Sequence, residues 1–337
     1  MARQAGTELL ERAPDEAPAP TPARVPLLAR VLGGVGRTLI TAGVLILLFV
    51  AYQLWGTGIR TSQAQNRLDD DFAEQLEQAQ GGVIGEPQTP ETTPTTGRDP
   101  VIVASDLAPE LLPQAGAVAG RMQIPRLGSF DWYFVEGVSV DDLKQGPGHY
   151  PQTPLPGQAG NSGIAGHRTT YGAPFANIDQ LQPGDELAVT TVQGTFTYMV
   201  RGQEIVAPSA IEVLDDGHWT KPDGTPVANT LTLTACHPKY SAAQRIIVWA
   251  ELVGNPAPAT PRLESPVRSL DNSGDRASKW PAVLWALLCA LIWLMAWAVG
   301  KKWRRAKWPA YGIFILPFLV ALFFFFENFS RLLPSNY

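Results

Sequence analysis

Cysteine and charge are both scarce in this chain of 337 residues. Its two cysteines, Cys236 and Cys289, are too few for a disulfide-rich scaffold or for a zinc site built from four thiolates. Charged residues make up only 17% of the chain, and a net charge of −5 argues against a nucleic-acid-binding protein, which would present a basic face. Conversely, 31 glycines and 30 prolines are too many for a helical bundle or a coiled coil.

Three long apolar segments predict transmembrane helices at residues 38–55, 281–300 and 309–326. Each is uncharged and long enough for a bilayer span, which needs about 17–25 apolar residues. A signal peptide is the alternative for the first segment, but its apolar core would be shorter and a small-residue cleavage site would follow it. Buried core helices are the alternative for the other two, and their length and purity disfavour it.

The basic residues predict how these spans are oriented, because cytoplasmic loops are enriched in Lys and Arg. The loop 301–308 joins the second and third spans and carries Lys301, Lys302, Arg304, Arg305 and Lys307. We therefore expect this loop and the segment 1–37 in the cytoplasm. Residues 56–280 and the tail 327–337 then lie outside the membrane, so the protein is expected to be a multi-pass cell-membrane protein.

Composition divides the outer region into linkers and one compact domain. Residues 56–117 form a stalk and a Pro/Thr-rich linker, and residues 255–280 form a second linker. Within the stalk, Thr61–Gln80 has the pattern of a polar helix with a thin apolar line at Leu68, Phe72 and Leu76. We interpret this helix as a juxtamembrane stalk, with the apolar line as a weak self-association face.

Residues 118–254 have the size of a single domain and a β pattern of short, alternating or β-branched runs between turn residues. Seven or eight such strands are typical of a closed barrel or of a sandwich. Brief helical signals occur at Pro174–Leu181 and Ser209–Leu214. The predicted strands are Met122–Leu127, Trp132–Val135, Gly163–His167, Glu186–Val192, Thr195–Val206, Thr230–Cys236 and Arg245–Val253.

Cys236 is the candidate nucleophile of this domain. It ends a predicted strand, and no second cysteine lies outside the membrane to pair with it. An unpaired extracytoplasmic cysteine is prone to oxidation and misbridging, so its presence indicates a use. An intermolecular disulfide and inert burial are the alternatives. Cys289 lies within the second span and is interpreted as a small apolar side chain.

A cysteine nucleophile needs a base, and His167 is the best-placed histidine. It ends an apolar strand beside small residues, although a structural role is also open. His237 is adjacent to Cys236, and neighbours on a strand point to opposite faces. His149 and His218 lie in turn or loop sequences, where a surface role is the simplest interpretation.

Arg245 is the candidate oxyanion stabiliser. It opens the strand that follows Cys236 across one loop, and consecutive strands are usually neighbours. A guanidinium beside the sulfur would offer several fixed N–H donors to a developing oxyanion. A solvated charge at a strand edge is the alternative interpretation.

These residues together resemble the sortases. Thr232–Cys236 is similar to the Thr-Leu-x-Thr-Cys strand of that family, Asn161–Arg168 resembles its histidine strand, and Arg245 stands where its essential arginine follows. The motifs Gly-His-Tyr-Pro at 148–151, Ala-Gly-His-Arg-Thr-Thr-Tyr-Gly at 165–172 and Cys-His-Pro at 236–238 look most like those of the class E sortases of actinobacteria. The resemblance implies a mainly β fold: a closed eight-stranded barrel with short helices, here joined to three transmembrane helices. It also implies a cysteine transpeptidase of the cell surface.

The resemblance implies a role for each site residue and no metal or cofactor. Cys236 would be the nucleophile, His167 the general acid/base and Arg245 the oxyanion stabiliser. Thr234, Ala235 and Tyr133 are the expected substrate-binding residues, and an aromatic side chain that only packs in the barrel is the alternative for Tyr133. Ala235 departs from the family pattern, because it replaces the threonine that usually precedes the cysteine and so removes a hydroxyl near the nucleophile.

The implied reaction joins two partners at the membrane surface. A secreted protein with a Leu-Ala-x-Thr-Gly or Leu-Pro-x-Thr-Gly sorting signal would be cleaved between Thr and Gly. The amine of a peptidoglycan precursor (lipid II) would then accept the acyl group from a thioester. Two alternatives stay open: an extracytoplasmic cysteine peptidase that passes the acyl group to water, and a non-catalytic membrane-tethered assembly module.

Overall fold

The computed structural model describes residues 27–81, 112–262, 270, 278–302 and 307–330. Much of the Pro/Thr-rich linker, part of the basic loop and the C-terminal tail therefore lie outside the described residues. The chain divides into two compact units, Met1–Leu48 and Phe49–Tyr337. The β domain belongs wholly to the second unit.

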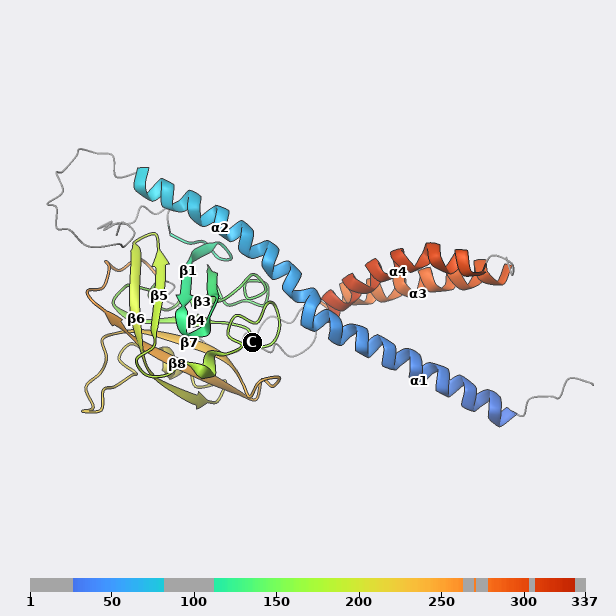
Figure 1. Cartoon of the computed structure of the whole chain (residues 1–337), viewed down its shortest axis with the longest axis horizontal. Coiled ribbons are helices and arrows are strands. Elements are labelled where there is room, and N and C mark those ends of the chain that lie inside the picture. Colours follow the sequence, from blue (N-terminus) through green and yellow to red (C-terminus); the bar gives the residue numbers. More distant parts are fainter. Residues whose placement is uncertain (1–26, 82–111, 263–269, 271–277, 303–306, 331–337) are drawn as a thin grey trace, which may run out of the picture. The chain divides into compact units, whose positions relative to one another are not determined.

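The β domain is a closed barrel, with strands in the order β1-β2-β3-β4-β7-β8-β6-β5 (Figure 1). This settles the choice between barrel and sandwich in favour of the barrel. Strand β3 has only two residues, too short to leave a pattern in the sequence, and was not predicted. The strands are β1 (Val118–Ile124), β2 (Phe130–Glu136), β3 (Gly148–His149), β4 (Gly160–Ala165), β5 (Glu186–Thr191), β6 (Gly194–Val206), β7 (Asn229–His237) and β8 (Gln244–Val253).

Side-chain alternation along β7 separates the barrel interior from its outer face. Leu231, Leu233 and Ala235 belong to the apolar core that fills the interior. Thr234 and Cys236 alternate with them and point outward, where Cys236 joins a second buried cluster. The candidate nucleophile therefore lies on the outer face of the barrel wall.

Three short 3-10 turns lie within the domain: η3 (Pro125–Leu127), η4 (Ile178–Gln180) and η5 (Ile211–Leu214). The turn η3 replaces the end of the strand predicted at Met122–Leu127, because Pro125 cannot donate to a strand ladder. Both η4 and η5 fall inside the segments predicted to be helical, but each is shorter than predicted.

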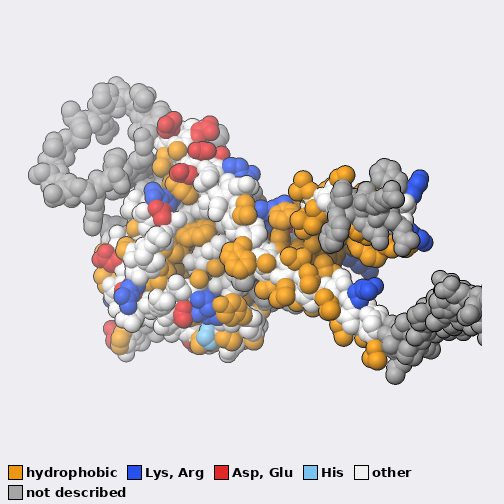
Figure 2. All heavy atoms as spheres, turned by 45° about the vertical axis from the view of Figure 1, so that its right-hand side comes forward, with side chains coloured by type: hydrophobic (Ala, Val, Ile, Leu, Met, Phe, Trp, Pro, Cys, Tyr) orange, Lys and Arg blue, Asp and Glu red, His pale blue; other side chains and the backbone are white. Residues whose placement is uncertain are grey.

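The remaining helices are α1 (Leu27–Ala51), a π-helical turn η1 (Tyr52–Gly56), α2 (Thr57–Gly81), α3 (Trp280–Lys302) and α4 (Lys307–Ser330). Among the described residues, three stretches are long and apolar enough to cross a membrane: Val31–Ala51, Trp280–Lys302 and Tyr311–Ser330. Hydrophobic side chains gather on the surface of the α3–α4 hairpin (Figure 2). The first span begins earlier than predicted, because the small and apolar residues before Arg37 continue the helix.

The polar helix expected at Thr61–Gln80 is present as α2, but its apolar line has a different role from the one predicted. Leu68 and Phe72 are each 3% exposed and pack with Val118 and Val135 of the barrel. The line is thus buried within its own chain, which corrects the interpretation of the line as a self-association face.

Candidate active site

Cys236 lies near the end of β7, between β4 and β8. In the antiparallel pair β7–β8, Cys236 stands directly opposite Arg245. In the parallel pair β4–β7, Ala165 stands opposite Thr234, and the Gly166 N–H donates to the Thr234 carbonyl at 3.0 Å. Continuing that register brings His167 level with Cys236. Since directly opposed residues share one face of a sheet, the structure brings the three predicted residues together.

All three side chains are almost fully buried, with exposed fractions of 3% for Cys236, 4% for His167 and 1% for Arg245. His167 is oriented by its own loop: its Nδ1 lies 3.3 Å from Thr170 Oγ1, and its ring lies 4.9 Å from the ring of Tyr171. Burial excludes bulk water and strengthens electrostatic interactions between these groups.

Within the described part of the chain, the Arg245 guanidinium makes hydrogen bonds through one of its three nitrogens and not through the other two. Its Nη1 donates to the carbonyls of Ala242 at 3.1 Å and Gln244 at 3.0 Å. Its Nε and Nη2 have no hydrogen-bond partner among the described residues, although both atoms are buried. Buried donors without acceptors are costly. The N–H groups of these two nitrogens are therefore available to an oxygen atom that the described residues do not supply.

Arg168 is a site residue that the sequence analysis did not assign. Its side chain is 4% exposed and makes an ion pair with Asp179 at 2.8 Å. Its Nη1 lies 3.2 Å from the Cys236 carbonyl and 3.3 Å from His237 Nδ1. Arg168 thus ties the end of β7 to the segment after β4. In the sequence, only its position directly after His167 could have pointed to Arg168 as a site residue.

Thr234 and Ala235, both expected to bind substrate, lie on opposite sides of the barrel wall. Thr234 shares the outer face with Cys236, and its Oγ1 lies 3.1 Å from the hydroxyl of Tyr150. Ala235 is 1% exposed and lies in the interior core. Alternation along the strand explains this placement, which does not support a substrate contact for Ala235. The missing hydroxyl therefore faces the core rather than the cysteine.

Tyr133 is placed against α2 rather than with Cys236. Its ring packs edge-on against Phe72 at 5.8 Å, and its hydroxyl donates to Asp69. Burial, followed by the hydrogen bond to Asp69, raises the pKa of Tyr133 to about 12. These contacts assign Tyr133 to the α2–barrel interface and do not support its expected role in substrate binding.

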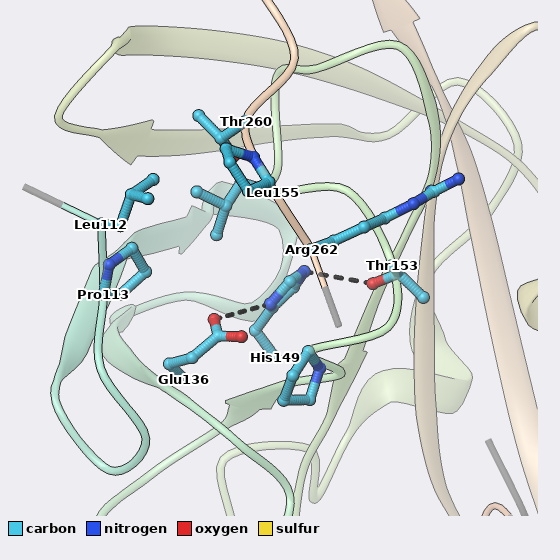
Figure 3. Close-up of a pocket in the computed structure, with 10 residues that line it drawn as sticks. Leu112, Pro113, Glu136, His149, Thr153, Leu155, Thr260 and Arg262 are labelled. Carbon is cyan, nitrogen blue, oxygen red and sulfur yellow. Dashed lines mark hydrogen bonds and ion pairs between the residues drawn. The ribbon is translucent and has the colours of Figure 1, made fainter. Parts of the chain in front are cut away.

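His149 is buried, which corrects the expectation of a surface role. Its Nδ1 lies 2.8 Å from Glu136 Oε2 and its Nε2 lies 3.0 Å from the Pro154 carbonyl oxygen. It lines a pocket with Thr153 and Arg262, shown in Figure 3, that does not include the cysteine. Both ring nitrogens are engaged, so His149 has a structural role and is a poor alternative to His167.

The outer-face cluster around Cys236 also includes Leu270, which belongs to the predicted linker 255–280. Leu270 is 3% exposed, and its backbone N–H donates to the Pro208 carbonyl at 2.9 Å. It shares this cluster with Leu214 and Trp219. The linker therefore contributes at least one residue to the packing of the β domain.

Comparison with known proteins points to a single family. A family model described as the sortase domain matches residues 122–253. The chain is 32% identical over 225 residues to sortase SrtE1 of Streptomyces coelicolor, covering 65% of this chain and 56% of that protein. It thus spans little more than half the length of that relative.

Two further relatives are matched over a larger share of their own length. The chain is 30% identical over 144 residues to sortase D of Bacillus subtilis, covering 42% of this chain and 67% of that protein. The structure of sortase E from Streptomyces avermitilis has 38% sequence identity and a TM-score of 0.37, covering 42% of this chain and 91% of that one. With its sortase-domain match and these sequence relatives, the chain belongs to the sortase family, whose members are cysteine transpeptidases.

Proposed function

We propose that this protein is a membrane-anchored sortase that joins secreted proteins to a cell-wall precursor. The observation that carries the proposal is that Cys236 of β7 stands opposite Arg245 of β8, while the continued β4–β7 register brings His167, two residues after β4, level with Cys236. The two unpartnered donors of Arg245 add to it, because they suit the oxyanion of acyl transfer. Neither feature is needed for a purely structural module.

In the first half of the reaction, the Cys236 thiolate attacks the carbonyl carbon of the threonine in the sorting signal. Arg245 donates hydrogen bonds to the oxyanion of the tetrahedral intermediate. The His167 imidazolium gives its proton to the glycine nitrogen as the C–N bond breaks. The products are a peptide with a free glycine amine and a thioester on Cys236.

In the second half, the incoming amine attacks the thioester carbonyl. His167, now a neutral imidazole, takes the proton from this amine, and Arg245 again holds the oxyanion. The C–S bond then breaks, and Cys236 leaves as a thiolate. An amide bond replaces the thioester, and the imidazolium–thiolate pair is restored for the next cycle.

We propose a Leu-Ala-x-Thr-Gly or Leu-Pro-x-Thr-Gly sorting signal as the donor and the amine of lipid II as the acceptor. The resemblance of the sequence motifs to class E sortases implies the first of these signals. Three candidate spans among the described residues support a multi-pass anchor in the cell membrane. The basic loop 301–308 supports an orientation with the barrel, residues 118–254, outside. At the outer leaflet the barrel would meet both secreted proteins and lipid-linked precursor.

The test is an amine-dependence assay on the full chain in detergent micelles. Each pentapeptide signal is incubated with and without a nucleophilic amine such as triglycine, and the products are identified by mass spectrometry. We expect a product in which the acyl fragment is joined to the added amine. Cleavage that yields only the free acid at every amine concentration would identify a peptidase instead.

A further inference from the structure

The loop after His167 has a backbone conformation that needs support from its surroundings. Tyr171, Gly172 and Ala173 have φ angles of 52°, 73° and 47°. Non-glycine residues seldom adopt such angles, and a run of them persists only where neighbouring groups impose it. The loop is closed at its base, because the Phe175 N–H donates to the His167 carbonyl at 3.0 Å.

Helix α2 provides a direct contact to this loop through the hydroxyl of Thr57. The Tyr171 N–H donates to Thr57 Oγ1 at 3.1 Å, and the same hydroxyl donates to the Gln53 carbonyl at 2.8 Å. Thr57 is 1% exposed. Because its hydroxyl both donates and accepts, its orientation is fixed and it can hold the backbone of Tyr171 in place.

The contact extends from Tyr171 to the imidazole of His167. The two rings lie 4.9 Å apart at an angle of 38°. Thr170, the residue before Tyr171, has its Oγ1 3.3 Å from His167 Nδ1. A displacement of Tyr171 would therefore move both groups that orient the imidazole.

Helix α2 is itself fixed on the barrel by side chains on one face of the helix. Thr61 Oγ1 donates to the Lys144 carbonyl at 2.9 Å. Gln65 accepts from the Tyr133 N–H and donates to the Tyr133 carbonyl, each at 2.9 Å. The two Gln65 bonds are paired hydrogen bonds to the backbone of strand β2, and the Thr61 bond is made to a neighbouring turn, so the helix cannot slide or rotate without breaking them.

Helix α4, which contains a candidate membrane span, also contacts α2. Arg60 makes an ion pair with Glu327 near the end of α4, and its guanidinium lies over the ring of Phe323 at 5.5 Å. Glu327 is only 7% exposed. The helical hairpin that follows the barrel in the sequence thereby helps to hold α2 one turn from Thr57.

We propose that α2 is a positioning element of the active site and that Thr57 is its key residue. Thr57 holds the Tyr171 loop, and the loop sets the orientation of the His167 imidazole relative to Cys236. The inference rests on the proposed function, in which His167 is the general acid/base. Thr57 touches neither the substrate nor the reacting atoms, so it is a positioning residue.

The test compares three variants of the full chain in detergent micelles. Thr57→Val keeps the shape of the side chain but removes the hydroxyl, whereas Thr57→Ser keeps it. Ser62→Ala is the matched control, since Ser62 lies on the exposed side of α2 and donates to the Gly58 carbonyl of the same helix. Because small misplacements at an active site are costly, we expect Thr57→Val to lower kcat by about 10- to 100-fold with little change in KM. Thr57→Ser and Ser62→Ala should stay close to the wild type.

A second readout separates positioning from general loss of structure. The rate at which iodoacetamide alkylates Cys236 is measured against pH, and melting of the full chain is recorded for each variant. We expect Thr57→Val to displace the midpoint of the alkylation profile, and Thr57→Ser to restore it. If Thr57→Val does not fold, Thr57→Ala takes its place with the same expectation.

The outcomes distinguish this inference from the proposed function. A folded Thr57→Val protein with the kcat and alkylation profile of the wild type would overturn the positioning role. Equal losses in Thr57→Val and Thr57→Ser, with no displacement of the profile, would overturn it as well. Failure of the wild type to form any acyl-enzyme would instead overturn the proposed function, while the alkylation profiles would still test the positioning.

Discussion

Replacing Arg245 with lysine separates a sortase from a generic cysteine hydrolase. The arginine directly opposes Cys236 and is 1% exposed, with Nε and Nη2 unpartnered among the described residues. Lysine keeps the positive charge, but it has a single nitrogen in place of the planar fork. It can reach either the Ala242 carbonyl or an oxyanion, so at least one donor to the oxyanion is lost.

The size of the effect follows from the loss of that donor. Removing one oxyanion donor costs about 10²–10³ in rate, or about 3–4 kcal/mol. Because the bond is made in the transition state, kcat and kcat/KM should fall together. If Arg245 anchored only the peptide backbone, KM would rise with kcat unchanged.

The assay measures both constants with a fluorescence-quenched Leu-Ala-x-Thr-Gly peptide and the full chain. Arg201→Lys is the matched control, because Arg201 is 44% exposed and pairs with Glu251 at the barrel surface. It should retain wild-type constants. A kcat/KM for Arg245→Lys within a few-fold of the wild type would refute the catalytic role of Arg245.

Four further predictions follow from the same contacts. Cys236→Ala should abolish acyl-enzyme formation without loss of fold, as measured by mass spectrometry and melting, and turnover by this variant would exclude Cys236 as nucleophile. His167→Ala should lower kcat by about 10²–10⁴, the contribution of general acid–base catalysis, and near-wild-type turnover would move the role to another residue. In intact cells a membrane-impermeant thiol reagent should label Cys236 and leave Cys289 unlabelled; labelling of Cys236 only after permeabilisation would invert the proposed topology. Hydrogen bonding to Arg121 lowers the pKa of Asp131, so Asp131→Asn should reduce the free energy of unfolding by less than about 1 kcal/mol near neutral pH. A carboxyl group whose pKa is lowered in the folded state stabilises the fold only while it is ionised. The difference in unfolding free energy between the wild type and Asp131→Asn should therefore vanish as the pH falls through the folded-state pKa of Asp131. A difference that persists in strong acid would contradict this prediction.

The parts of the site that lie on long strands could be predicted from the sequence. Alternating residues and turn signals locate β7 and β8, and one loop between them makes Cys236 and Arg245 neighbours. The pairing of β4 with β7 joins segments far apart in the sequence. The position of His167 beside Cys236 could therefore be expected only from the family resemblance. The inward direction of Ala235 follows from strand alternation and could have been predicted.

Other features depend on contacts between distant segments and leave no local pattern. Arg168 contacts Asp179 and the Cys236 carbonyl only in the folded barrel. The apolar line of α2 has the same sequence whether it packs on its own barrel or on another chain. Strand β3 is too short for alternation to be visible, so the burial of His149 could not be inferred from its turn-like sequence.

The most direct test of the central claim is to locate the covalent intermediate. The full chain is incubated with a Leu-Ala-x-Thr-Gly peptide in the absence of amine, quenched in acid, digested and analysed by mass spectrometry. We predict the acyl fragment on the peptide that contains Cys236, and its loss as an amide product when triglycine is added before the quench. An adduct on any other residue, or cleavage without an adduct that amine can discharge, would contradict the account.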